Sequence, residues 1–443
     1  MGWGKTLLAA ALIAVAGPGL AAAQTKPVQI EFWHGLPQPL GGLLEQIVAD
    51  FNASQSRYHV NASFKGGYPE VMTAAIAAFR SGNAPDVVQM FEVGTATMMA
   101  AKGAVKPVYE LMKETGEPFD PANYIPAVRG YYSTPDGKML SLPFNSSTPI
   151  MWYNKDAFVK AGLDPEKPPL TWPDTIAATK KLKAAGIACP LTTAWPSWVE
   201  IENFSAIHDV PLATKVNGMA GLDTELKINS PLHVKQIQNL IDMQKEGLFK
   251  YGGRDSTADA LFTSGECAII HDSSGLRARI VKEAKFKWGD APLPYWPDVK
   301  GAPKNSILGG ASLWVMKSPK RTAEEYKGVA EFLRYLGKPE VVAKWSMETG
   351  YLPITKAGFD LVKKSGYYEK NPGADIPYLQ MTRTEPTENS RGLRLGNMLE
   401  IRKITQEELE KAFQGKQDAK QALDNIVQRG NAVLRAFERA NQS

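Results

Sequence analysis

Apolar segments of strand length alternate with amphipathic segments of helical period over residues 28–102. The strand candidates are Val28–Trp33, Tyr58–Phe64 and Asp86–Phe91. The helix candidates are Gly42–Asn52, Pro69–Arg80 and Thr95–Lys102. In the first of these helices, apolar side chains recur three and four residues apart, which places them on one face. Strands that alternate with helices of this length predict βαβ units and a parallel sheet.

The rest of the chain repeats this alternation less regularly. Further strands are expected at Ile150–Tyr153, Ala268–His271 and Ile307–Met316, and further helices at Thr171–Ala185, His233–Glu246, Glu400–Phe413 and Asp418–Glu438. A chain of 443 residues exceeds what one hydrophobic core usually supports, so we expect two α/β lobes. We assign residues 24–143 with 305–338 to an N-terminal lobe, and residues 144–304 with 339–443 to a C-terminal lobe.

The two expected crossings between the lobes are Phe144–Ser147 and Asn305–Gly310. Both are short and extended, which suits a hinge beside an interlobe cleft. The first crossing opens a run of four small hydrogen-bonding side chains, Asn145–Thr148, that Pro149 ends. Such a run is typical of a surface loop. Because it adjoins an apolar strand, the alternative is that its donors hold a ligand.

Strand ends indicate where a ligand would bind. In open α/β sheets, ligands bind outside the carboxyl ends of the strands. This rule selects His34, the segment Lys65–Tyr68 and Glu92, which should converge on one cleft.

The first residues, Met1–Ala23, have the pattern of a cleavable secretory signal peptide. Lys5 gives the positive start, and the apolar stretch Leu7–Ala16 is shorter than the ~20 residues that a membrane span needs. No Cys follows the small residues at the expected cleavage site, which counts against a lipid anchor. We therefore expect an exported protein whose mature chain begins at Gln24.

Composition excludes several classes of protein. The formal net charge of +5 is small and scattered, so the sequence gives no sign of a nucleic-acid partner. The cysteines, Cys189 and Cys267, could form a disulfide in an oxidising compartment, but their spacing does not show whether they meet. Neither has the neighbours of a catalytic cysteine.

The sequence carries none of the common enzyme signatures that we sought. It has no G-x-S-x-G elbow, no P-loop, no H-E-x-x-H and no Cys/His spacing of a metal site. Its five histidines are scattered, and no two are four residues apart. A catalytic carboxylate pair is left open by these observations. We expect a protein that is not an enzyme and that uses no cofactor or metal.

Several longer motifs resemble one family. The segments GNAPDVVQMFEVGTATMMA, PFNSSTPIMWYNKDAFVKAGLDPEKPP, GGASLWVM, TGYLPITKA, YYEKNPGAD and GLRLGNMLEIR are similar to those of periplasmic sn-glycerol-3-phosphate-binding proteins of bacterial ABC importers. The resemblance covers essentially the whole mature chain, in order. It implies the two-lobed fold of periplasmic solute-binding proteins, closure over a ligand, and delivery to a membrane permease with a cytoplasmic ATPase.

The resemblance also implies a set of ligand contacts. Carried over by position, these are Tyr68, Glu92, Ser147, Trp195, Ser273, Gly310, Tyr351 and Arg402. One departure from the family pattern lies beside them, because Asp272 precedes Ser273 where a small residue is usual. An acid at this position would weaken anion binding unless its side chain points away.

Each implied contact has a chemical role in this interpretation. Phosphate oxygens only accept hydrogen bonds, so the hydroxyls of Ser147 and Ser273 and the N–H of Gly310 would donate to them. Arg402 would be the charge partner of the phosphate. Glu92 would lie at the opposite wall and accept hydrogen bonds from glycerol hydroxyls.

The three implied aromatic contacts and the remaining basic residues have competing explanations. Trp195, Tyr68 and Tyr351 would contact the C–H surface of the ligand, with Trp198 an equal candidate for the role of Trp195. His34 and Lys65 are second choices for the cleft edge. Three further basic residues are expected to be solvated surface or loop charges, namely Arg391, Arg394 and Lys403.

Three functions remain in competition at this point. The preferred one is a receptor for sn-glycerol 3-phosphate, with glycerophosphodiesters such as glycerophosphocholine as related ligands. A sugar or oligosaccharide receptor on the same fold would instead show several aromatic platforms and no need for Arg402. A secreted phosphodiesterase would require a metal cluster or a nucleophile that the sequence does not reveal.

Overall fold

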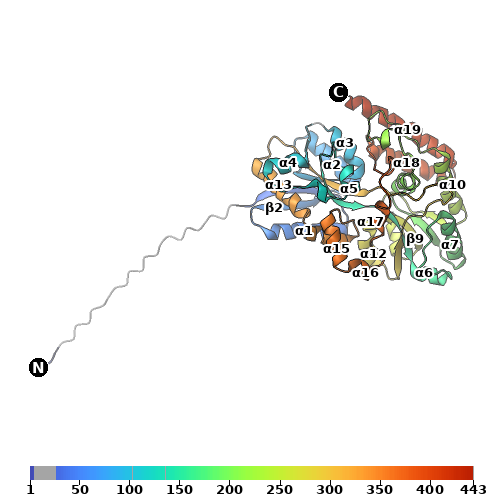
Figure 1. Ribbon diagram of the computed structural model, residues 1–443, viewed down its shortest axis with the longest axis horizontal. Helices are drawn as coiled ribbons and strands as arrows, with labels where there is room; N and C mark the ends of the chain where they lie inside the picture. Colours follow the sequence, from blue (N-terminus) through green and yellow to red (C-terminus); the bar gives the residue numbers. More distant parts are fainter. Residues whose placement is uncertain (4–25, 102, 135, 443) are drawn as a thin grey trace.

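The computed structural model describes residues 1–3, 26–101, 103–134 and 136–442. The expected signal peptide, Met1–Ala23, lies almost wholly outside the described residues. The described chain forms two lobes that lie side by side, each built around its own sheet (Figure 1). None of the described helices combines the length and apolarity that crossing a membrane would require.

The first lobe contains a six-stranded sheet. Its strands follow the order β2-β1-β3-β11-β4, and β5 also pairs with β11. Their bounds are β1 Val28–His34, β2 Tyr58–Phe64, β3 Val87–Phe91, β4 Val105–Lys106, β5 Leu142–Ser147 and β11 Gly309–Met316. Strand β1 is parallel to β2 and β3, as the alternating pattern predicts, whereas β11 runs antiparallel to β3, β4 and β5.

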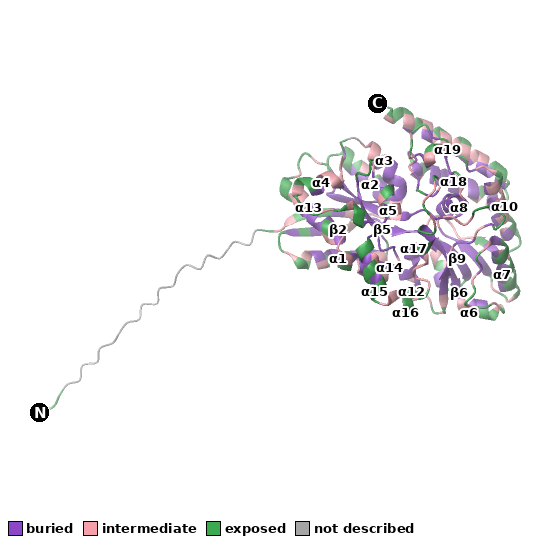
Figure 2. Cartoon of the chain, in the orientation of Figure 1, coloured by how far each residue is buried: buried purple, intermediate pink, exposed green. Residues whose placement is uncertain are grey.

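Helices cover this sheet and bury its apolar side chains (Figure 2). They are α1 Leu40–Ser54, α2 Tyr68–Arg80, α3 Thr95–Ala100, α4 Val108–Thr115, α5 Pro126–Tyr131, α13 Ala323–Leu336 and α14 Pro339–Thr349. The expected lobe division placed residues from 339 onward in the C-terminal lobe. Helix α14 nevertheless packs on α1, where Lys344 pairs with Asp50, and its Trp345 belongs to the core of the first lobe.

The second lobe contains a five-stranded sheet in the order β10-β6-β9-β7-β8. Its strands are β6 Pro149–Asn154, β7 Cys189–Thr193, β8 Phe249–Tyr251, β9 Cys267–Ser273 and β10 Trp288–Ala291. Strands β7, β8 and β9 are parallel, and β6 runs antiparallel to β9 and β10. Cys189 lies opposite Cys267 at the start of β7 and β9, and the two form a disulfide.

The helices of the second lobe, and short elements in both lobes, complete the described chain. They are α6 Lys155–Lys160, α7 Trp172–Ala184, α8 Phe204–Ile207, α9 Thr214–Asn217, α10 Pro231–Lys245, α11 Asp259–Thr263, α12 Arg277–Glu283, α15 Lys356–Lys364, α16 Tyr367–Lys370, α17 Ile376–Met381, α18 Met398–Phe413 and α19 Ala419–Asn441. The short turns are η1 Glu92–Gly94, η2 Pro121–Asn123, the π-helical η3 Trp198–Asn203, and η4 Ser274–Leu276. Thr171 caps α7 by accepting a hydrogen bond from the N–H of Asp174, as expected.

The polar run at the first crossing is a strand and not a surface loop. Residues 145–147 complete β5, in which Ser147 pairs with Gly309 and Ser146 with Gly310 of β11. Every residue from Asn145 to Thr148 is buried. The pairing requires glycine at position 310, because a Cβ there would lie 1.8 Å from the carbonyl oxygen of Asn145 and φ is +88°.

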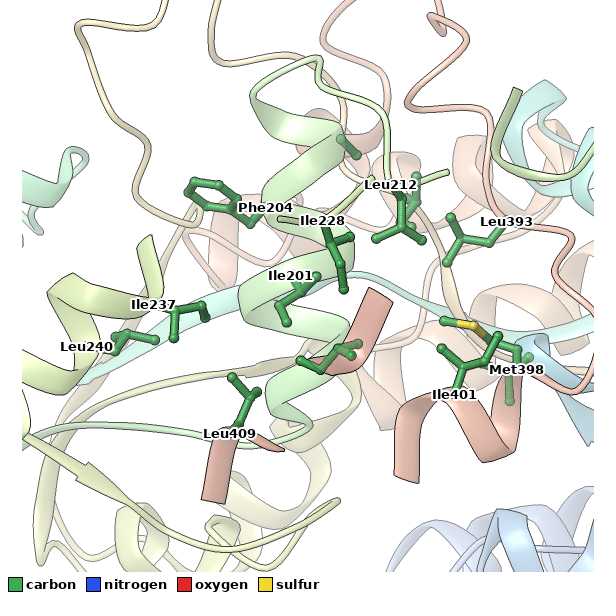
Figure 3. Packing of buried hydrophobic residues seen from close by; sticks show 14 of the residues in the cluster. Ile201, Phe204, Leu212, Ile228, Ile237, Leu240, Leu393, Met398, Ile401 and Leu409 are labelled. Carbon is green, nitrogen blue, oxygen red and sulfur yellow. The ribbon is translucent and has the colours of Figure 1, made fainter. Parts of the chain in front are cut away.

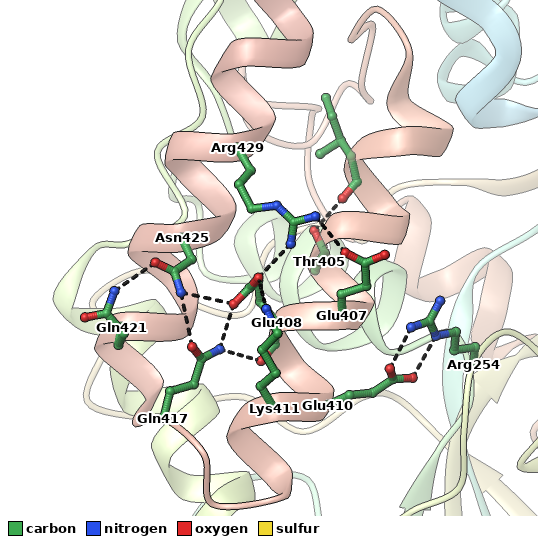
Figure 4. Close-up of polar contacts among 11 residues, drawn as sticks. Arg254, Thr405, Glu407, Glu408, Glu410, Lys411, Gln417, Gln421, Asn425 and Arg429 are labelled. Atoms are coloured by element: carbon green, nitrogen blue, oxygen red, sulfur yellow. Dashed lines mark hydrogen bonds and ion pairs between the residues drawn. The ribbon is translucent and has the colours of Figure 1, made fainter.

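Helix α18 is held in place by polar contacts on both sides (Figure 4). Arg429 of α19 donates to Glu407 and to Glu408, with both distances 2.6 Å. On the other side, Arg254 binds the carboxylate of Glu410 in bidentate fashion at 2.7 and 2.6 Å. These pairs fix the helix that carries Arg402.

Candidate functional site

A cavity of about 490 Å³ is lined by residues of both lobes. All eight side chains or backbone positions that the family resemblance implied lie on its wall, namely Tyr68, Glu92, Ser147, Trp195, Ser273, Gly310, Tyr351 and Arg402. A volume of this size is typical of small-molecule sites. The structure therefore brings the expected residues together, and their contact with a ligand stays a prediction.

The ends of strands position several of these residues. Glu92 follows β3 directly, Ser147 ends β5, Ser273 ends β9, and Trp195 lies two residues after β7. The second choices, His34 and Lys65, do not line the cavity. The ring of His34 is fully buried and burial lowers its pKa to about 4, while Lys65 Nζ lies 4.5 Å from the centroid of the Trp33 ring. The next residue after β1, Gly35, does reach the wall.

Two serine hydroxyls face the cavity with a donor available. The Ser273 hydroxyl oxygen accepts a hydrogen bond of 3.0 Å from the N–H of Gly275, which leaves its own O–H able to donate. The Ser147 hydroxyl at the end of β5 also lies on the cavity wall. Both can therefore donate to an acceptor in the cavity.

A buried chain of amides orients Tyr68. The N–H of Gly35 donates to Gln89, the Gln89 amide donates to Asn145, and the Asn145 amide donates to the Tyr68 hydroxyl, at 2.8, 2.8 and 2.6 Å. The O–H of Tyr68 is engaged by the Tyr351 hydroxyl, and this hydrogen bond acts to raise the pKa of Tyr68 and to lower that of Tyr351. Burial is the larger effect and raises the pKa of both phenols, so both stay neutral and the O–H of Tyr351 is left to donate.

Arg402 and Glu92 do not occupy opposite walls, which corrects the expected arrangement. Arg402 Nη2 donates to Glu92 Oε1 at 2.6 Å. The same guanidinium also donates to Glu202, from Nε to Oε1 at 2.8 Å and from Nη2 to Oε2 at 2.6 Å. Burial raises the pKa of Glu92, against the opposing effect of Arg402. Two carboxylates and one guanidinium leave the cluster with a formal charge of −1, so Arg402 is not a free cation.

The unusual acid Asp272 does not point away from the cavity. It lies on the cavity wall, 1% exposed, and its Oδ1 accepts a 2.6 Å hydrogen bond from the N–H of Ser273. Burial and then the neighbouring Asp259 raise the pKa of Asp272 well above its usual range. A protonated carboxyl is neutral, which removes most of the expected repulsion of an anion.

Trp195 and Trp198 both line the cavity but in different settings. Trp195 is partly exposed, has a left-handed φ of 46°, and donates its N–H to the carbonyl of Asp255 at 2.8 Å. Its ring centroid lies 6.5 Å from that of Tyr68. Trp198 is buried, with its ring against Gly309. Non-glycine residues with positive φ cluster at functional sites, which favours Trp195 as the aromatic contact.

One of the three basic residues expected to be solvated is not. Arg391 and Lys403 are exposed, but Arg394 is partly buried and donates to the carbonyls of Tyr131 and Ser133 at 2.8 and 3.1 Å. Burial lowers the pKa of Arg394. Its contact joins the segment before α18 to the first lobe.

Several residues of the wall were missed from the sequence. The acidic side includes Glu70, Asp255, Asp259 and Glu283, with Arg279 among them. Arg279 donates to Glu283 at 2.8 Å and lies 3.6 Å from Asp259. Glu70 lies in α2 after β2, Asp255 and Asp259 follow β8, and Glu283 lies in α12 after β9. The strand-end rule could have found Asp255, but scattered acids carry no other signal. Among the described residues, no group of His, Cys, Asp or Glu is arranged to hold a metal ion.

Comparison with known proteins defines the class. Residues 46–374 match the family described as bacterial extracellular solute-binding protein, and the chain belongs to this family. The expected two-lobed solute-binding fold is confirmed by solved structures. The unliganded and acarbose-bound GacH receptor of Streptomyces glaucescens covers 93% of this chain and 99% of its own, with a TM-score of 0.75 at 16% identity.

Relatives of higher identity share one name. The chain is 50% identical over 415 residues to the sn-glycerol-3-phosphate-binding periplasmic protein UgpB of Yersinia pseudotuberculosis, which covers 94% of each chain. It is 48% identical over 439 residues to the protein of that name from Pectobacterium atrosepticum, covering 99% of this chain and 97% of the relative. UgpB of Mycobacterium tuberculosis, solved with glycerophosphocholine, has a TM-score of 0.76 at 23% identity, covering 93% and 99%.

Proposed function

We propose that the protein is the substrate-binding component of an ABC importer, that it binds sn-glycerol 3-phosphate, and that it delivers this ligand to a membrane permease with a cytoplasmic ATPase. The single observation that carries the proposal is the shared wall on which all eight implied contact residues lie. Relatives of about 50% identity over nearly the whole chain carry the matching name. Their name also supports a periplasmic location, reached through the signal peptide proposed at Met1–Ala23.

The donors in the cavity suit a phosphate group. Ser147, Ser273 and Tyr351 present neutral hydroxyls, and Gly310 follows Gly309, the residue that pairs with Ser147 on the neighbouring strand. A phosphate oxygen needs donors and gains nothing from acceptors. These neutral groups, and not Arg402, would bind the phosphate, since the guanidinium of Arg402 is already shared by two carboxylates.

The pair Glu92–Arg402 suits the hydroxyl groups of glycerol. A hydroxyl can donate to Glu92 while it accepts from Arg402, so a charged pair that is already formed offers both functions at once. The residual charge of −1 on the cluster would keep the phosphate at the other contacts. Trp195 and Tyr68 would pack on the C–H surface between the two ends.

The acidic wall supports glycerophosphodiesters as further ligands. The cavity has the volume of a site for larger molecules, which leaves room for a group esterified to the phosphate. Asp255, Glu70 and Glu283 on this wall would attract a cationic head group such as choline. Glycerophosphocholine is therefore the diester of choice for a test.

Closure of the two lobes is part of the proposal. We propose a hinge at the crossings of β5 to β6 and into β11, with α14 assigned to the first lobe because of its packing on α1. Residues lining the cavity come from both lobes, so the ligand would be enclosed between them. No catalytic step is proposed, because the family is one of binding proteins.

A sugar receptor is the second candidate, and one observation favours it. Five aromatic residues line the cavity, namely Tyr68, Phe91, Trp195, Trp198 and Tyr351. Aromatic faces of this kind suit the C–H surfaces of sugar rings. The two carboxylates bound to Arg402 do not distinguish a sugar ligand from a glycerol phosphate.

Thermal unfolding in the presence of ligands tests the proposal. The mature protein is heated alone and with sn-glycerol 3-phosphate, glycerophosphocholine, maltose or inorganic phosphate. A ligand at a hundred times its Kd adds about 2.7 kcal/mol of stability, which shifts Tm by a readily measured amount. Stabilisation by the phosphorylated glycerols alone is the expected result. Stabilisation by maltose alone would replace the proposal with the sugar receptor.

A further inference from the structure

Glu202 holds Arg402 from behind the cavity wall. Its two carboxylate oxygens accept from Nε and Nη2 of Arg402 at 2.8 and 2.6 Å, in the bidentate geometry that guanidinium prefers. The Glu202 side chain is 1% exposed and is not among the residues that line the cavity. Any effect of Glu202 on a ligand must therefore pass through Arg402.

The local backbone places Glu202 for this contact. It lies in η3, a π-helical turn that also carries Trp198 of the cavity wall. Such turns are rare in proteins and are found often at functional sites. The Ser197 hydroxyl donates to Glu202 Oε1 at 3.0 Å, so the carboxylate is held independently of Arg402.

The apolar core fixes both partners. Ile201, next to Glu202, and Ile401, next to Arg402, belong to the same cluster of buried side chains between η3 and α18 (Figure 3). The ion pair thus joins two elements that already pack together. Little movement of the guanidinium is available to a ligand.

The contact determines which donors Arg402 can offer. Glu202 and Glu92 engage Nε and Nη2, and Nη1 donates to no protein group within the described part of the chain. Bidentate binding of a phosphate would require two parallel N–H donors from one edge of the guanidinium. Glu202 occupies the edge formed by Nε and Nη2.

We propose that Glu202 is a positioning residue that determines ligand specificity. By binding Nε and Nη2 of Arg402, Glu202 keeps these two donors from anions. It thereby presents Arg402 together with Glu92 as a donor–acceptor pair for ligand hydroxyls. The proposal rests on the proposed function. It predicts that Glu202 sets the preference for a glycerol phosphate over a phosphate ester that lacks hydroxyls. An ion pair with only a structural role would change the affinity for both ligands alike.

The experiment compares sn-glycerol 3-phosphate with n-propyl phosphate, which has the same phosphate on a chain without hydroxyls. Calorimetric titration gives Kd for each ligand with the wild-type protein and with Glu202→Gln. The substitution keeps the shape of the side chain but removes its negative charge and one of the two oxygens that accept from Nε and Nη2 of Arg402. The ratio of the Kd for n-propyl phosphate to that for sn-glycerol 3-phosphate is expected to fall at least about tenfold. Arg402 loses the carboxylate that holds it in place for the ligand hydroxyls, and the formal charge of the cluster rises from −1 to 0, which favours the phosphate.

A matched control is available on the same helix. Glu407→Gln, on α18, the helix of Arg402, removes an ion pair with Arg429 at a more exposed site outside the cavity wall. Its Kd ratio should equal that of the wild type. An unchanged ratio in Glu202→Gln would overturn the proposal, even if stability fell.

A second variant covers the case in which Glu202→Gln does not fold. Glu202→Asp keeps the charge but withdraws the carboxylate from Nε and Nη2 of Arg402, so the ratio should again fall, and an unchanged ratio would again overturn the proposal. Failure of the wild-type protein to bind sn-glycerol 3-phosphate would overturn the proposed function as well. Binding by the wild type with an unchanged ratio in both variants would overturn this inference alone.

Discussion

The carboxylate of Glu92 accepts a 2.6 Å hydrogen bond from the guanidinium of Arg402, although 310 positions separate them in the chain. Glu92 begins the turn after β3 in the first lobe, and Arg402 lies on α18, which packs in the second. The bond therefore joins the lobes directly at the cavity. It also makes Arg402, one of the two arginines on the cavity wall, part of a buried ionic cluster, with consequences for both stability and binding.

Arg402→Ala should lower stability as well as remove ligand binding. Truncation leaves the buried carboxylates of Glu92 and Glu202 without their counter-charge, which typically costs about 3–5 kcal/mol. Urea unfolding measures the loss, and calorimetric titration with sn-glycerol 3-phosphate measures binding.

Arg254→Ala is the control for this loss of stability. Arg254 forms a comparable bidentate pair with Glu410, but 38% of its side chain is exposed. Solvent-exposed pairs contribute about 0–1 kcal/mol, so this variant should unfold near the wild-type urea concentration. Equal losses in the two variants would show that burial of the Arg402 cluster is not decisive.

Gly310→Ala should disrupt the crossing between the lobes. A left-handed φ costs a non-glycine residue about 1–2 kcal/mol, and a Cβ would also collide with the carbonyl oxygen of Asn145. We expect a loss of at least this size in urea unfolding, together with weaker ligand binding. Gly130→Ala is the control, because φ is ordinary there and no atom lies within 4 Å of the added Cβ. That variant should stay within about 1 kcal/mol of the wild type.

Local sequence signals predicted helices and strands of the fold, and they predicted part of the candidate site. The bounds of β2, the N-cap Thr171 and the strand end at Glu92 follow from apolar period and capping residues, whereas Ser273 came only from the family resemblance. The strand character of Asn145–Ser147 did not, because it depends on pairing with β11, more than 160 positions away. Polar residues in a strand become favourable only when a distant partner strand satisfies the backbone.

The ion-pair network was beyond sequence reasoning for the same reason. Glu202 is separated from Arg402 by 200 positions, and a charge in an apolar helical segment carries no sign of its partner. The family resemblance supplied Arg402 and Glu92 as contacts but not their mutual bond. Assigning each an independent role produced the incorrect placement at opposite walls, since a buried charge is stable only with its partner.

Removal of the disulfide should lower stability and leave the ligand site formed. Cys189 and Cys267 close a loop with a sequence separation of 78, and the loss of such a link costs about 2–4 kcal/mol. Strands β7 and β9 remain hydrogen-bonded in register without it. The double variant Cys189→Ala/Cys267→Ala should unfold at lower urea concentration, with an unchanged Kd for sn-glycerol 3-phosphate at 25 °C. A large rise in Kd would mean that the link positions Trp195 and Ser273.

The paired acids Asp259 and Asp272 should make anion binding depend on pH. Burial raises the pKa of Asp259 to about 6 and that of Asp272 well above its usual range. On the pKa of Asp259, Glu283 acts in the same direction as burial and Arg279 acts against it. The first of the pair to ionise as pH rises is therefore Asp259, near pH 6. An anion bound beside Ser273 is repelled by the ionised form, so its affinity is highest below pH 6 and falls above it.

Glycerophosphoglycerol is a suitable probe for this dependence, because a phosphodiester keeps a single charge between pH 5 and 8. Its Kd should rise about threefold to tenfold across that range, which corresponds to a coupling of up to about one pKa unit. Asp259→Asn lacks the group that ionises near pH 6, so its affinity should change less across that pH than the affinity of the wild type. A flat profile in the wild-type protein, or an equal slope in Asp259→Asn, would contradict the assignment. A slope that depends on Asp259 would also explain how a cavity with this many carboxyl groups accepts a phosphate. Burial and Asp259 keep Asp272, the acid next to Ser273, protonated and neutral.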